Sequence, residues 1–192
     1  MHKNSRLIMN KVLYDTEYLQ LKSTTSKSGN PWVYAHRPNV TNVVVILPVC
    51  RDEILFLTEE RPPLQAEDKG KYCIGLPAGL VGDERKGESI EEAIKAELKE
   101  EAGLIAGKIE IKVNKAAGSS GCVSETCVIA IAYINDKNTV CPPVDDGGII
   151  VDRVWVKKEN ILEWLNKKNA EGYVISSSTL GALFYLFAEE KL

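Results

Sequence analysis

The sequence predicts an α/β sandwich, in which a mixed β-sheet is flanked by helices. Short apolar segments separated by turn residues fill the first part of the chain and are typical of strands. One amphipathic helix follows, and further strand patterns come after it. Two more amphipathic patterns close the chain. This order of strands, helix, strands, helix and helix favours a single mixed sheet with helices on its faces.

The size and charge of the chain limit its class of function. With 192 residues it is long enough for one domain with a substantial core. Its 24 basic and 27 acidic residues give a net charge of −3, without the basic surface typical of nucleic-acid binding. No apolar run reaches the length of a membrane span, and the start MHKNSR is not a secretion signal. We therefore expect neither nucleic acid nor a membrane as partner.

The cysteines indicate the cellular compartment of the protein rather than a metal site. They are odd in number and far apart, at Cys50, Cys73, Cys122, Cys127 and Cys141, and only His2 and His36 could complete a zinc site with them. Reduced thiols are typical of proteins in the cytoplasm, which is the location we expect.

The N-terminal part predicts a small antiparallel β-unit, residues 1–38, joined to a main domain, residues 39–192. Strand patterns occur at residues 12–14, 18–22 and 32–36, with a turn region at 24–31. An isolated hairpin of this size is only marginally stable, so the unit needs another surface to pack on.

The main domain opens with an unbroken apolar run, residues 42–49, which predicts a strand buried on both faces. Residues 65–71 have the composition of a charged loop. Further strands are expected at residues 54–58, 73–77, 109–113, 127–134 and 151–156.

Two helices are expected at the C-terminal end. The first covers residues 158–168, with an apolar face made of Ile161, Leu162, Trp164 and Leu165. The second is capped within residues 176–178, and its core face is expected to consist of Leu180, Leu183, Phe184 and Phe187.

Residues 79–104, GLVGDERKGESIEEAIKAELKEEAGL, form the stretch around which the rest is organised. A loop leads into a helix that begins with a capping box of Ser89 and Glu92 and ends at Gly103. The apolar residues Ile90, Ala93, Ile94 and Leu98 recur at helical spacing and define its buried face.

Two carboxylates lie on the wrong side of this helix for an ordinary surface helix. Glu97 and Glu101 fall within the apolar sector, one turn apart, and Glu100 lies at its edge. The alternative is a solvated acidic face, but Lys95 and Lys99 already occupy the side toward water. Paired carboxylates near a core are costly unless a cation neutralises them, so the pattern favours a divalent-ion site.

These residues resemble the Nudix box, G-x5-E-x7-R-E-U-x-E-E-x-G-U, where U is aliphatic. Glu88 and the run from Glu97 to Leu104 match it, whereas Ala96 stands at the position of the arginine. Gly82 gives the formal spacing, but the segment 76–79, LPAG, resembles the opening of the box in ADP-ribose pyrophosphatases, which places Gly79 first with a three-residue insertion. The resemblance implies a Nudix-type α/β/α sandwich with a mixed sheet.

The resemblance also implies the metal site. Mg²⁺ or Mn²⁺ would be held by Glu97, Glu101, Glu88 and the backbone carbonyl of Ala78, with Glu100 assisting in catalysis. The base that deprotonates water is left open between two residues. Glu125 matches an acidic position of the loop S-P-G-x-x-S/T-E, and Asp146 lies in the long loop 135–148, where a simple acidic turn is the alternative.

Substrate contacts follow from the same resemblance. Arg61, in a segment similar to Q-x-R-x-P, would bind the pyrophosphate, with a surface arginine as the alternative. Glu125 would contact substrate, and Tyr18 and Trp32 would stack on the base, although core or interface packing is an alternative for each aromatic residue. Ser120 replaces the proline of the ADP-ribose subgroup.

The sequence therefore predicts an enzyme that hydrolyses a nucleoside diphosphate linked to another group, most simply ADP-ribose to AMP and ribose 5-phosphate. The alternatives are a pyrophosphatase for another nucleoside diphosphate sugar and a Nudix domain that binds such a compound without cleaving it. The resemblance further implies a homodimer in which residues 1–38 form the contact.

Overall fold

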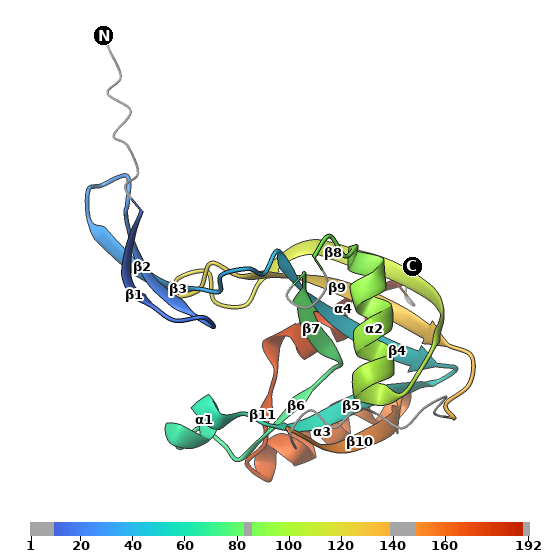
Figure 1. Cartoon of the computed structure of the whole chain (residues 1–192). Helices are drawn as coiled ribbons and strands as arrows, with labels where there is room; N and C mark the ends of the chain where they lie inside the picture. Colours follow the sequence, from blue (N-terminus) through green and yellow to red (C-terminus); the bar gives the residue numbers. More distant parts are fainter. Residues whose placement is uncertain (1–9, 83–85, 139–148, 190–192) are drawn as a thin grey trace.

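The computed structural model describes residues 10–82, 86–138 and 149–189. It confirms both the α/β sandwich and the antiparallel β-unit near the N-terminus, which forms a separate three-stranded sheet (Figure 1). This small sheet has the order β1-β2-β3, with β1 at Lys11–Asp15, β2 at Gln20–Thr25 and β3 at Pro31–His36. In Figure 1 it projects from the body of the molecule.

The main sheet is mixed. Its described strands are β4 (Asn42–Cys50), β5 (Glu53–Glu60), β6 (Tyr72–Gly75), β7 (Ala78–Val81), β8 (Ala106–Ala117), β9 (Thr126–Ile134), β10 (Ile150–Lys157) and β11 (Val174–Ile175). They run in the order β11-β6-β5-β4-β9-β8, with β10 also paired to β5 and β7 to β4. The pairs β4–β9 and β6–β11 are parallel, and the other pairs are antiparallel.

Helices cover both faces of this sheet. Helix α2 (Ile90–Ala102) packs on one face, and α3 (Ile161–Ala170) and α4 (Ser177–Glu189) pack on the other. A 3-10 turn, η1 (Lys158–Asn160), precedes α3, and the short α1 (Pro62–Ala66) follows β5. Strand β4 joins the two cores because its side chains alternate. Val44 and Ile46 belong to the α2 side, and Val45 and Leu47 to the other. The expectation of a strand buried on both faces is confirmed.

Two local expectations were wrong. Residue 79 was expected to open a loop, but it lies in β7, where Gly79 pairs with Val44 of β4. Residues 65–71 were expected to be loop throughout, but Gln65 and Ala66 complete α1. This helix starts at Pro62, and proline suits a first helical turn. The two-residue strand β11 is too short to give a sequence pattern.

The predicted core faces of the last two helices are partly wrong. Leu162, Leu180 and Phe184 are 72%, 52% and 66% exposed. The buried face of α4 is instead Thr179, Ala182, Leu183 and Leu186. These four residues have the spacing of one face of a helix. This face turns small residues toward the sheet, and Gly181 lies close to Ile129. Close approach of the backbone therefore decided the rotation of α4, rather than the size of its apolar side chains.

Within the described ranges, no helix combines the length and the apolar character needed to cross a bilayer. Four cysteines, Cys50, Cys73, Cys122 and Cys127, carry free thiols.

Candidate active site

The box helix α2 is fixed at both ends as its sequence predicts. The backbone N–H of Glu92 donates to Oγ of Ser89 at 3.2 Å, and the N–H of Ser89 donates to the Glu92 carboxylate at 2.9 Å. Gly103 ends the helix with a φ of 69°, a left-handed conformation that favours glycine. The buried face of the helix consists of Ala93, Ile94, Leu98 and Ala102. This anchoring determines the direction in which the carboxylates of the helix point.

Glu97 and Glu101 are directed at strand β7. The N–H of Ala78 donates to Oε2 of Glu101 at 2.8 Å. Gly79 lies against the carboxyl group of Glu97, and a Cβ at this position would overlap that group. Because Gly79 has no side chain, the carboxyl group of Glu97 can lie against it. The carboxylates of Glu97 and Glu101 therefore both contact the segment Ala78–Gly79.

The electrostatics of this pair are unfavourable in the absence of a cation. The pKa of Glu101 is raised to about 8, mainly by burial and also by the nearby charges of Glu97 and Glu59, against the opposing effects of the Ala78 N–H and Arg61. The carboxylates of Glu59, Glu97 and Glu101 and the guanidinium of Arg61 thus lie in one partly buried region. Their charge favours binding of a cation.

The residues present fit a divalent ion of the hard type. Carboxylate and carbonyl oxygens are the donors that Mg²⁺ and Mn²⁺ prefer. Glu97, Glu101 and the backbone of Ala78 lie together, as the sequence predicted. Across the described residues, side chains of His, Cys, Asp and Glu do not form a ready-made cluster of three ligands. The fit therefore rests on the pair of carboxylates and on the backbone beside it.

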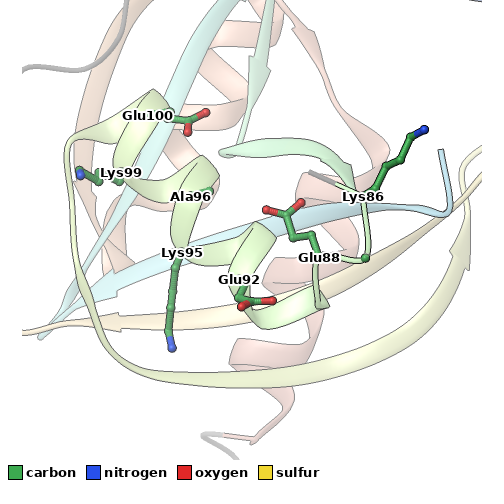
Figure 2. A pocket seen from close by; sticks show the side chains of 8 residues that line it. Lys86, Glu88, Glu92, Lys95, Ala96, Lys99 and Glu100 are labelled. Carbon is green, nitrogen blue, oxygen red and sulfur yellow. The ribbon is translucent and has the colours of Figure 1, made fainter. Parts of the chain in front are cut away.

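Glu88 and Glu100 line a different hollow. Figure 2 shows a pocket of about 600 Å³ on the outer side of α2, with Ala96 between these two acids. The Glu88 side chain reaches from the loop back toward the helix, while Lys95 and Lys99 point away from it (Figure 2). Glu97 and Glu101 do not line this pocket. Glu88 and Glu100 thus line this pocket, whereas Glu97 and Glu101 are directed at strand β7.

Arg61 is held by a carboxylate that the sequence reasoning did not assign to the site. Its Nη2 donates to Oε1 of Glu59 at 2.5 Å. The Arg61 side chain is 46% exposed, whereas the side chain of Glu59 is only 4% exposed. The signal for Glu59 was an acidic residue at the end of a buried strand, which is uncommon without a partner.

Glu125 also has a basic partner that the sequence reasoning missed. Arg37, just after β3, donates through Nε to Oε2 of Glu125 at 2.9 Å. The two residues lie 88 positions apart, so no local pattern could have paired them. They line a small pocket of about 170 Å³ together with His36, Val40, Thr41, Asn42, Ser124 and Thr126.

The predicted aromatic residues lie on the N-terminal sheet, away from Glu97 and Glu101 in the same chain (Figure 1). Tyr18 is 75% exposed, in the turn between β1 and β2. Trp32 is 50% exposed, and its indole N–H donates to the carbonyl of Gly121 at 2.7 Å. Asp146 lies outside the described residues.

Comparison with known proteins agrees with this geometry. The family model described as the NUDIX domain matches residues 39–174. A Caenorhabditis elegans protein with the provisional name nudix hydrolase 2 is 23% identical over 189 residues, which covers 92% of this chain and 81% of that protein.

A similar solved structure is the crystal structure of an ADP compounds hydrolase, with a TM-score of 0.70 and 20% sequence identity. The match covers 95% of this chain and 92% of the other chain, and at this identity it supports the fold. The family match covers most of the chain, residues 39–174. The chain belongs to the Nudix family and is a Nudix hydrolase.

Proposed function

We propose that this Nudix hydrolase cleaves the pyrophosphate bond of a nucleoside diphosphate linked to another group, in a reaction that depends on a divalent ion. The leading substrate is ADP-ribose, which would give AMP and ribose 5-phosphate. The observation that carries the proposal is the seating of Glu97 and Glu101 against Ala78–Gly79. The similarity to an ADP compounds hydrolase supports the substrate class.

The reaction adds water across one P–O bond of the diphosphate and releases two monophosphates. Glu97, Glu101 and the carbonyl of Ala78 would hold Mg²⁺ or Mn²⁺, with Glu88 and Glu100 assisting. Such an ion polarises phosphate oxygens and lowers the pKa of water. Arg61 would balance the negative charge of the phosphates with its planar guanidinium.

The proton of the attacking water needs an acceptor. Glu125 is one candidate, and its pairing with Arg37 fixes the position of its carboxylate. Asp146 is the other candidate from the sequence. An arginine that holds the carboxylate of Glu125 in one orientation supports Glu125 as a group that contacts or orients the substrate.

We also propose that the protein acts as a homodimer through residues 1–38. The small sheet exposes many large apolar side chains, which favours a covered surface. They are Val12, Leu13, Tyr14, Tyr18, Leu19, Leu21, Trp32 and Val33. A second copy would also bring Tyr18 and Trp32 near a site that they do not reach within one chain. The free thiols support a reducing compartment such as the cytoplasm.

A second candidate function is binding without cleavage. Ala96 stands where the family has arginine, and beside it lies the open pocket that Glu88 and Glu100 line. The alanine lacks the guanidinium of that arginine, which favours a site that binds a nucleotide sugar without completing catalysis. Another nucleoside diphosphate sugar as substrate remains the alternative among enzymes.

The test is a panel of nucleoside diphosphate compounds with Mg²⁺ or Mn²⁺, in which chromatography detects the monophosphate product. We expect release of AMP from ADP-ribose. The joint variant Glu97→Gln and Glu101→Gln should lower turnover at least about a hundredfold, because it removes charge that stabilises the transition state through the ion. The matched control is Glu91→Gln, on the exposed side of the same helix. Unchanged metal-dependent turnover in the joint variant would contradict the proposal, and tight binding without product would favour the binding module.

A further inference from the structure

Glu59 is a buried carboxylate beside the candidate site, and no step of the proposed reaction uses it. The residue is only 3% exposed, although it lies at the end of strand β5. Gly75 of the neighbouring strand β6 makes room for it, because a Cβ at Gly75 would overlap Oε2 of Glu59. An acidic side chain is rarely buried in this way unless it is paired. Its environment is therefore built to keep a carboxylate in one place.

The partner of this buried carboxylate is Arg61, two residues further along the chain. The two side chains are joined at 2.5 Å between Nη2 and Oε1. Arg61 is 46% exposed, so the guanidinium reaches from a buried anchor into the solvent-accessible side of the site. An ion pair with one buried partner is screened less by salt than a surface pair.

The pair also lies close to the box carboxylates. The carboxyl group of Glu59 lies against Gly75, three residues before Ala78 in the same segment. Glu101 in turn is bonded to the backbone of Ala78. The guanidinium of Arg61 is thus held next to the place where the proposed function puts the diphosphate.

We propose that Glu59 is a positioning residue that fixes the guanidinium of Arg61 for binding a phosphate group of the substrate. This inference rests on the proposed function. Glu59 itself is too buried to touch substrate, so it acts through Arg61. A flexible arginine loses rotamer freedom when it binds phosphate, and an arginine already held on one edge loses less.

The test is a double-mutant cycle with the full-length protein and α,β-methylene ADP-ribose, whose bridging carbon prevents cleavage. Calorimetry with Mg²⁺ gives the dissociation constant for wild type, Glu59→Gln, Arg61→Ala and the double variant. We expect Glu59→Gln to weaken binding about tenfold, since it replaces the ion pair with Arg61 by a hydrogen bond to a neutral amide. The double variant should bind no more weakly than Arg61→Ala, because the two residues act as one unit.

Two further measurements separate positioning from a general structural role. With a cleavable substrate, Glu59→Gln should raise KM more than it lowers kcat, and Glu59→Asp should recover part of the affinity because it keeps the charge. Glu91→Gln removes the same charge from an exposed ion pair on α2 and should leave the dissociation constant unchanged. Should Glu59→Gln fail to fold, Glu59→Asp takes its place in the cycle.

The outcomes are distinct. Equal affinity of Glu59→Gln and wild type would overturn the role of Glu59 while leaving the proposed function intact. Losses that multiply in the double variant would also overturn it, since the two residues would then act independently. A wild-type protein that neither binds the analogue nor cleaves any compound of the panel would overturn the proposed function, and this inference with it.

Discussion

At the scale of single residues, the candidate site depends on two glycines that leave room for neighbouring carboxyl groups. Gly79 makes room for the carboxyl group of Glu97, and Gly75 makes room for that of Glu59. The two glycines flank the segment that carries Ala78, whose N–H binds Glu101. Three carboxylates can therefore approach the same short stretch of backbone.

Gly79→Ala should displace Glu97, since the new methyl group would overlap its carboxyl group. We expect Mn²⁺ binding to weaken at least about tenfold, a loss typical of a misplaced ligand or supporting group. Calorimetric titration with Mn²⁺ measures the loss. Gly118→Ala is the matched control, because a Cβ there meets nothing within 4 Å. Equal Mn²⁺ affinity of Gly79→Ala and wild type would mean that Glu97 does not take part in ion binding.

At the scale of elements, α2 carries the acidic pair and its N-terminal cap fixes the first turn. Ser89→Ala removes the acceptor for the N–H of Glu92 and should cost about 1 kcal/mol of unfolding free energy. Urea denaturation measures this cost, and Ser89→Thr should restore most of it because threonine also caps helices. A Ser89→Ala protein as stable as wild type would show that packing alone holds the helix start.

On strand β8, the carboxylate of Glu110 is paired with the ammonium groups of Lys108 and Lys112. Lys108 and then Lys112 lower the pKa of Glu110 to about 2, from an ordinary value of 4.5. The folded state thus favours ionised Glu110, so its contribution to stability is complete above about pH 4.5 and disappears as the pH falls toward about 2.

Glu110→Gln should accordingly destabilise the protein by less than about 1 kcal/mol at pH 7, because these charges are partly exposed. The difference from wild type should shrink as the pH is lowered to 3. Denaturation midpoints at pH 7, 5 and 3 give the comparison. An equal difference at all three values would show that the ion pair does not contribute.

At the scale of the whole molecule, the N-terminal sheet is attached to the body through the loop 118–125. The N–H of Ala35 donates to the carbonyl of Cys122 at 2.8 Å, and Ser124 returns a bond to Ala35 at 3.1 Å. His36 and Ser124 add a side-chain bond at 2.9 Å. Through these bonds, a change at the exposed sheet can reach Glu125 and its partner Arg37.

The exposed apolar sheet predicts a dimer. Leu21 and Val33 lie on one face, as the pairing of β2 with β3 shows, and they are 41% and 50% exposed. We expect wild type to sediment at twice the chain mass of 21.2 kDa. The joint variant Leu21→Glu and Val33→Glu should be monomeric, because it places charges on a face that would be buried. Lys27→Glu, in the exposed turn before β3, is the control. A monomeric wild type at micromolar concentration would contradict the dimer.

Much of the fold could be predicted because local patterns carry it. The caps of α2 and the apolar run of β4 follow from neighbouring residues, and both are confirmed. The face of α4 could not be predicted, since Leu180 and Phe184 are as apolar as the buried Leu183. Strand β7 was missed because its four residues are strand only by pairing with β4.

The sequence by itself determined helix α2, which carries the acidic pair. Its start and end follow from its capping residues, and the inward direction of Glu97 and Glu101 follows from helical spacing. Only the tertiary structure decided that Glu59 holds Arg61, that Arg37 holds Glu125, and that Glu88 and Glu100 face a different pocket from the acidic pair. The physical reason is that Arg37 and Glu125 meet across 88 positions of chain, and that Glu59 is held in room left by Gly75 of another strand. Burial and hydrogen-bond geometry select such partners, and no pattern along the chain records them.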